Sequence, residues 1–159
     1  MFDKILFKLR NRFGGKSITI KETVQRIIEL KENSRKAIIA FVSDQAPLWS
    51  GKFHWSNFFQ WETPVVTGAE QIGKHVDALI FYAEMERIKR GYYRCKISRM
   101  IDDIQQYADY EVTDLFMSKL EQSIHKAPSY WLWTHNRWIR TREEIMVWYK
   151  RIIHKKENV

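Results

Sequence analysis

Two places in the chain combine residue types that could do chemistry. Residues 128–138 (PSYWLWTHNRW) hold three tryptophans and a tyrosine together with His135 and Arg137. An imidazole can move a proton near neutral pH, and a guanidinium can bind phosphate or carboxylate through paired hydrogen bonds. Asp44 directly follows the apolar run at 36–43, and ligands of open α/β sheets bind beyond the carboxyl ends of the strands. Proton transfer and anion binding are therefore open to these residues, although the aromatic segment also suits a packing role.

Several other chemistries have no residues to carry them. The sequence contains no glycine-rich phosphate loop and no G-x-S-x-G nucleophile elbow. The five histidines are scattered, and Cys95 is the one cysteine, so neither metal-ligand spacing nor an internal disulfide is present. We expect no metal and no cofactor, and we interpret Cys95 as a packing residue on a strand face.

Apolar periodicity and turn residues predict the elements that position these candidates. The expected order is mixed α/β within a single domain over residues 1–159. Thr67–Glu70 and Thr141–Glu144 each have the form of a capping box at the start of a helix. The elements that we expect are helices at 2–13 and 21–32, a buried strand at 36–43, an aromatic loop at 46–63, a helix at 67–75, a buried strand at 78–84 within a hairpin at 79–99, and helices at 112–124 and 142–156.

Five short motifs, taken in order, resemble one family. They are residues 9–14 (LRNRFG), 42–45 (VSDQ), 63–68 (TPVVTG), 82–93 (YAEMERIKRGYY) and 128–138. Together they resemble the C-terminal portion of the bacterial lipid A biosynthesis acyltransferases of lauroyl/myristoyl type, members of the glycerolipid acyltransferase superfamily. Each motif is short, and the resemblance depends on their order and on the tryptophan-rich last one.

The resemblance implies a fold, an activity and a location. The fold would be part of a glycerol-3-phosphate-acyltransferase-like sheet flanked by helices. The activity would be transfer of a fatty acyl chain from acyl carrier protein to a lipid A precursor or related lipid. The protein would lie peripherally on the cytoplasmic face of a Gram-negative inner membrane. Carried over onto matching positions, the substrate-binding candidates are Arg10, Asp44, Arg87, His135 and Arg137.

The chain departs from the family at its catalytic motif. In the family, the histidine of H-x-x-x-x-[DE] takes the proton of the acceptor hydroxyl, and the carboxylate orients the imidazole. None of the five histidines here has a carboxylate five residues later. We therefore expect no catalytic residue in this chain, the N-terminal part of the family fold to be missing, and the chain to be inactive by itself.

Charge leaves two alternatives open. The net charge of +8 and the isoelectric point of about 9.6 favour acidic partners such as a carrier protein, an anionic membrane surface or nucleic acid. The basic amphipathic helices predicted at 2–13 and 142–156 suit a non-catalytic module that binds a membrane surface. Nucleic-acid binding has no recognisable motif, and we do not expect it. The longest apolar runs, 37–42 and 78–83, are too short to cross a bilayer, and the first residues lack the pattern of a signal peptide.

Overall fold

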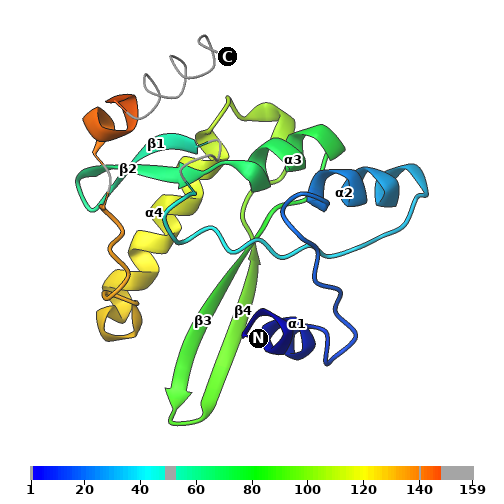
Figure 1. Cartoon of the computed structure of the whole chain (residues 1–159), viewed down its shortest axis with the longest axis horizontal. Coiled ribbons are helices and arrows are strands. Elements are labelled where there is room, and N and C mark those ends of the chain that lie inside the picture. Colours follow the sequence, from blue (N-terminus) through cyan, green and yellow to red (C-terminus); the bar gives the residue numbers. More distant parts are fainter. Residues whose placement is uncertain (1, 49–52, 140, 148–159) are drawn as a thin grey trace. The chain divides into compact units, whose positions relative to one another are not determined.

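The computed structural model describes residues 2–48, 53–139 and 141–147. The chain divides into two compact units, residues 1–40 and residues 41–159. The helices and strands are labelled in Figure 1.

The first unit consists of two helices, as the periodicity predicts. Helix α1 spans Phe2–Arg10 and helix α2 spans Thr23–Glu32. After α1 the chain makes one further turn, which ends at Gly14. The φ of Gly14 is +84°, in the left-handed region that glycine adopts without strain. At the end of α2, the backbone N–H of Asn33 donates to the carbonyl of Glu29 at 3.1 Å.

The buried strand predicted at 36–43 is wrong. These residues form no strand, and none of the described strands pairs with them. Ile38 and Val42 are almost wholly exposed, at 102% and 81%. A continuous apolar run becomes a buried strand only when neighbouring strands satisfy its backbone groups. Here the run links the two units instead, and Asp44 follows it in a bend rather than at a strand end.

The second unit begins with a hairpin where the sequence predicts a loop. Strands β1 (Phe53–Phe58) and β2 (Trp61–Val66) pair in antiparallel register from Phe53 opposite Val66 to Phe58 opposite Trp61. The two residues between them, Phe59 and Gln60, have φ of +52° and +65°, which is the backbone of a type I′ turn. The loop prediction for 46–63 is therefore wrong for its second half.

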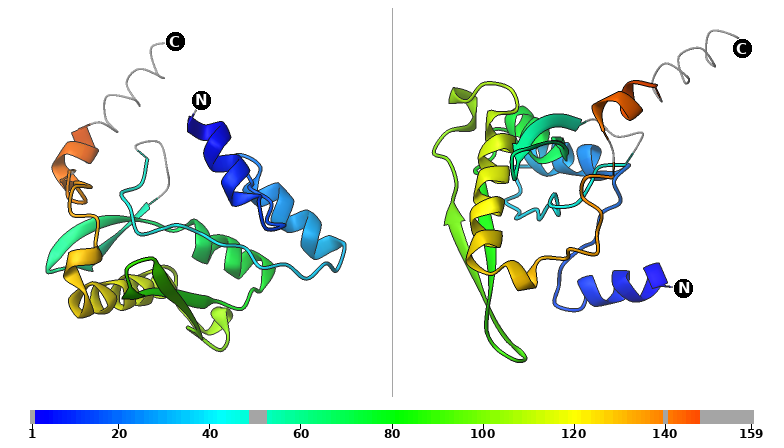
Figure 2. Two further views of the ribbon diagram at one scale, coloured as in Figure 1. Left: turned by 90° about the horizontal axis from the view of Figure 1, so that it is seen from below. Right: turned by 90° about the vertical axis from the view of Figure 1, so that its left-hand side faces the viewer.

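A second hairpin confirms the prediction for residues 79–99. Strands β3 (Phe81–Lys89) and β4 (Tyr92–Arg99) are antiparallel and joined at Gly91, whose φ is +81°. The expectation that residues 78–84 form a buried strand is wrong, because most of β3 is exposed and only Tyr82 and Glu84 are half-buried. The tip of this hairpin extends beyond α4 (Figure 2).

Helices α3 (Gly68–Val76) and α4 (Glu111–Lys126) confirm the two middle helices of the prediction. The capping box expected at 67–70 is wrong, because the Thr67 side chain makes no capping hydrogen bond. The Glu70 carboxylate instead accepts hydrogen bonds from the backbone of Tyr110 and Thr113, at 2.7 and 2.8 Å, at the start of α4. Two 3-10 turns, Ile104–Gln106 and Pro128–Tyr130, flank α4.

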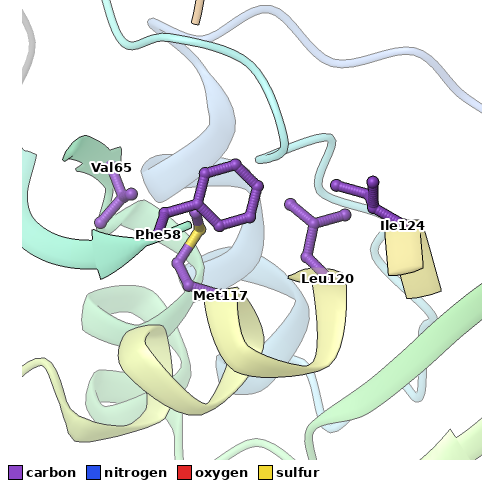
Figure 3. Packing of buried hydrophobic residues seen from close by; sticks show 5 residues of the cluster. All are labelled: Phe58, Val65, Met117, Leu120 and Ile124. Carbon is purple, nitrogen blue, oxygen red and sulfur yellow. The ribbon is translucent and has the colours of Figure 1, made fainter. Parts of the chain in front are cut away.

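The main hydrophobic core lies between α4 and the first hairpin (Figure 3). Met117, Leu120 and Ile124 recur along α4 at intervals of three and four residues, so they share one face of the helix. They pack against Phe58 of β1 and Val65 of β2. A smaller cluster of Ile101, Ile104 and Val112 lies at the other end of α4.

The capping box predicted at 141–144 is confirmed. The backbone N–H of Thr141 donates to the Glu144 carboxylate at 3.1 Å, and the N–H of Glu144 donates to Thr141 Oγ1 at 3.3 Å. Residues 142–147 are helical, and the remainder of the helix predicted to 156 lies outside the described residues.

The mixed α/β class is confirmed, with the described strands in two separate two-stranded antiparallel sheets. A single domain over 1–159 stays a prediction. Within the part of the chain that the structure describes, no helix combines the length and apolar character needed to cross a bilayer.

Candidate functional site

The bend after residues 36–43 meets the tryptophan-rich segment through one hydrogen bond. The backbone N–H of Ala46 donates to Nε2 of His135 at 3.1 Å. A neutral His135 that accepts at Nε2 carries its proton at Nδ1. While this bond is in place, Nε2 cannot take a proton from a substrate. The geometry therefore gives His135 a positioning role for the loop that carries Asp44.

The tryptophan-rich segment packs on the first hairpin and on α4. Indole Nε1 of Trp138 donates to Oγ1 of the buried Thr63 at 2.9 Å, and the Trp138 ring stacks on Phe58 at 6.0 Å between centroids. Trp131 contacts the same phenylalanine edge to face at 6.4 Å. Arg137 exposes 1% of its surface, so its guanidinium does not face solvent. The packing interpretation of the segment is confirmed for Trp131 and Trp138.

A polar network joins β3 to the C-terminal half of α4. The Ser123 hydroxyl donates to Glu84 at 3.0 Å, and Lys126 Nζ donates to the same carboxylate oxygen at 2.9 Å. Tyr82 lies 3.0 Å from Ser123 Oγ. Either hydroxyl of that pair can be the donor.

Electrostatics fix the charge states in this network. Hydrogen bonds from Lys126 and Ser123 lower the pKa of Glu84 from its ordinary value, so the carboxyl stays ionised. Partial burial raises the pKa of Tyr82, and the negative charges of Glu84 and Asp44 raise it further. Tyr82 therefore stays a neutral hydroxyl near Asp44. The network presents one anion, one cation and one neutral donor.

Arg87 meets the start of the tryptophan-rich segment. Its guanidinium carbon lies 5.4 Å from the centroid of the Tyr130 ring, and Nη1 lies 3.4 Å from the Tyr130 hydroxyl. The arginine is exposed, so its remaining donors are open to a ligand. A guanidinium that packs over an aromatic ring stays charged, and the contact limits its orientation.

The five predicted site residues thus divide into three groups. The structure joins the Asp44 loop to His135, and Arg87 to Tyr130 of the same segment. It buries Arg137 within the fold. Arg10 is the exposed last residue of α1 and belongs to the other unit.

Sequence reasoning missed the partners of Tyr82 and Glu84 on α4. Ser123 and Lys126 lie three residues apart and therefore share a helix face. That spacing was a usable signal, but only a known pairing of the helix with β3 makes it informative.

A second polar cluster, also missed, joins α3 to the start of α4. Lys74 Nζ lies 2.8 Å from Asp109 and 3.4 Å from Glu70, and a hollow of about 240 Å³ is lined by these residues with Gln71 and Tyr110. The hydrogen bond that Lys74 donates to Asp109 raises the pKa of Lys74. Because two carboxylates already pair with the lysine, we interpret this cluster as a structural contact between α3 and the residues before α4.

Among residues 2–48, 53–139 and 141–147, no group of three or more histidine, cysteine, aspartate or glutamate side chains is placed to hold a metal ion.

The family model for the bacterial lipid A biosynthesis acyltransferases matches residues 1–140. No curated protein matches the chain closely enough to count as a relative.

Proposed function

Because the chain belongs to the family of bacterial lipid A biosynthesis acyltransferases, we propose that it supplies the acceptor side of a fatty acyl transfer. The donor is an acyl carrier protein, and the acceptor is a lipid A precursor or a related lipid. The family match over residues 1–140 is the observation that carries this proposal.

The chain supplies no proton acceptor of the family type, since no histidine here is followed five residues later by a carboxylate. In the reaction, the acceptor hydroxyl attacks the thioester carbonyl of the donor, its proton passes to a base, and the carrier thiolate leaves. A hydroxyl is a poor nucleophile without such a base. His135 does not replace that base, because its Nε2 accepts from Ala46. We infer that the chain does not transfer acyl groups by itself.

The residues proposed to meet the acceptor are those around β3. Arg87 has donors open to solvent and a fixed direction over Tyr130, which suits a phosphate of the acceptor. The neutral Tyr82 hydroxyl and the Asp44 carboxylate suit the sugar hydroxyls of a glycolipid. Arg10, which belongs to the first unit, stays a predicted substrate-binding residue.

The unpaired outer edges of the β3–β4 hairpin support the proposal of a larger sheet. No described strand pairs with its outer edges. Two-stranded hairpins are marginally stable in isolation. We propose that this hairpin belongs to a sheet like that of the glycerol-3-phosphate acyltransferases.

A lipid acceptor places the reaction at a membrane. We propose a peripheral position on the cytoplasmic face of a Gram-negative inner membrane. The net charge of +8 suits both an acidic carrier protein and anionic lipid.

The test incubates the purified chain with acyl carrier protein loaded with a fatty acyl group and with a lipid A precursor. Lipid products are followed by mass spectrometry. We expect no acylated product and saturable binding of the precursor in detergent micelles. Acyl transfer that is lost on Asp44→Asn or His135→Ala contradicts the proposed division of roles. Absence of precursor binding contradicts the acceptor-side proposal itself.

A further inference from the structure

We propose that helix α1 and the turn after it dock on an anionic lipid bilayer, with the helix lying in the plane of the interface. α1 is the dark blue helix of Figure 1. The membrane location rests on the proposed function, whereas all residues of the contact surface belong to the first unit.

The first observation is a row of exposed apolar side chains. Ile5 and Leu9 are one turn apart and expose 53% and 54% of their surfaces, with Leu6 exposed beside them. Phe13, in the turn after the helix, is 90% exposed. Single exposed apolar residues are common on proteins, but a continuous row marks an interaction surface.

The second observation is the placement of positive charge. At about 100° per residue, Lys8 and Arg10 border the row on its two sides. Arg12 follows, with its guanidinium carbon 5.5 Å from the centroid of the Phe13 ring. The first 40 residues hold ten lysines and arginines against four carboxylates, so they carry +6 of the chain's net +8.

The third observation is that hydrogen bonds fix the turn after α1. The side-chain Oδ1 of Asn11 accepts from the backbone N–H of Ser17 at 2.7 Å, and the N–H of Gly14 donates to the backbone carbonyl of Asn11 at 3.3 Å. These bonds hold the chain that carries Phe13 directly after the helix. Phe13 therefore adds an exposed aromatic side chain within three residues of the last helical residue.

An anionic bilayer matches both features at once. Isoleucine, leucine and phenylalanine side chains enter the boundary between headgroups and acyl chains, and the lysine and arginine stems reach back to the lipid phosphates. Each basic residue near an anionic surface strengthens binding. A purely acidic surface would use only the charges and a purely apolar groove only the row, whereas a bilayer with anionic headgroups above its acyl chains uses both.

The experiment is co-sedimentation of the full chain with vesicles, without acyl donor or lipid A precursor. The vesicles contain phosphatidylcholine alone or mixed with phosphatidylglycerol. We expect binding only to the anionic vesicles, and weaker binding as salt is raised. Ile5→Ser combined with Leu9→Ser should weaken binding by about tenfold or more. Lys8→Gln combined with Arg12→Gln should weaken it by about thirtyfold at low salt.

Matched controls lie on the second hairpin. Ile97→Ser combined with Met85→Ser removes two apolar side chains that are 68% and 65% exposed, and Arg90→Gln combined with Lys96→Gln makes the same change in charge as the basic α1 variant. Neither control should change binding by more than about twofold, and circular dichroism should show every variant folded. Loss of binding by the controls to the same extent as by the α1 variants overturns the proposal. So does wild-type protein that does not distinguish the two kinds of vesicle.

A fluorophore reports where the surface contacts lipid. In a Cys95→Ser background, an environment-sensitive dye on Ile5→Cys should shift to shorter wavelength with anionic vesicles, and the same dye on Lys89→Cys should not. Equal shifts at both positions, or a shift at position 5 in self-associating protein without vesicles, overturn the proposal. Failure here with intact precursor binding refutes the docking surface and leaves the proposed function standing.

Discussion

Glu70→Gln gives the sharpest test of how the second unit is held together. Glu70 is 4% exposed on α3, and its carboxylate accepts from the N–H of Tyr110 at 2.7 Å and from the N–H and hydroxyl of Thr113 at 2.8 and 2.6 Å. It thereby satisfies backbone donors at the start of α4 and places a negative charge at the positive end of that helix.

The expected loss follows from these contacts. A hydrogen bond to a charged group contributes roughly 1.5–3 kcal/mol, and a carboxylate at a helix N-terminus adds about 0.3–1 kcal/mol. The amide keeps one acceptor oxygen but turns an NH₂ group toward donors. We expect Glu70→Gln to lower the free energy of unfolding by about 2–3 kcal/mol.

The assay is urea unfolding followed by tryptophan fluorescence, because all seven tryptophans lie in residues 41–159. With an m-value of roughly 2 kcal/mol per molar urea, the midpoint should fall by about 1 M. Glu86→Gln is the control, since its pair with Arg94 is 3.6 Å long and exposed. That variant should change stability by about 0.5 kcal/mol or less. Equal effects of the two substitutions would refute the role given to Glu70.

Three further predictions concern the candidate site. Tyr82→Phe should lower the free energy of unfolding by about 1 kcal/mol because Ser123 on α4 loses its hydrogen bond to the Tyr82 hydroxyl, whereas Tyr93→Phe on the exposed face should be neutral in the same urea assay. His135→Leu should speed hydrogen exchange of the Ala46 amide about fivefold, measured by NMR, and unchanged exchange would show that the bond is not formed in solution. The pKa of Glu84 is lower in the folded state, so its contribution to stability is present above the unfolded-state pKa and is lost as pH falls through the folded value. As pH is lowered from neutrality, the urea midpoint of Glu84→Gln should therefore fall less than that of the wild type. An unaltered pH profile would contradict the lowered pKa of Glu84.

The two capping boxes show where sequence reasoning succeeds and fails. Both have threonine followed three residues later by glutamate, and only the one at Thr141 forms. At the other, Glu70 meets the unsatisfied N–H groups of α4, which are 40 or more residues away in sequence. A local motif predicts local structure only when no distant donor competes for the same carboxylate.

The strand predictions failed for a related reason. The first hairpin was missed because its turn, Phe59–Gln60, has none of the Asn-Gly or Asp-Gly signals that favour a type I′ turn. The backbone N–H of Phe59 donates to Glu121 of α4 at 3.1 Å, so tertiary contacts stabilise a turn that the local sequence does not favour. In contrast, Arg90-Gly91 signals its own turn, and the second hairpin was predicted correctly.

The motifs of the candidate site could be predicted from the sequence, but the contacts between them could not. Order along the chain indicated the family, which the match over 1–140 confirms. The bond between Ala46 and His135 spans 89 residues, and no local pattern encodes it. The burial of Arg137 was also invisible, because arginine is ordinarily an exposed residue.

Photo-crosslinking with a lipid A precursor that carries a photoreactive group on a phosphate-bearing sugar is the most direct test of the central claim. The purified chain is labelled, digested and sequenced by mass spectrometry, with unlabelled precursor as competitor. We expect competed labels in residues 44–47, 82–92 and 128–138, and lower labelling with Arg87→Ala but not with Arg94→Ala. Labels confined to other segments, or labels that the competitor does not reduce, would contradict an acceptor site around β3.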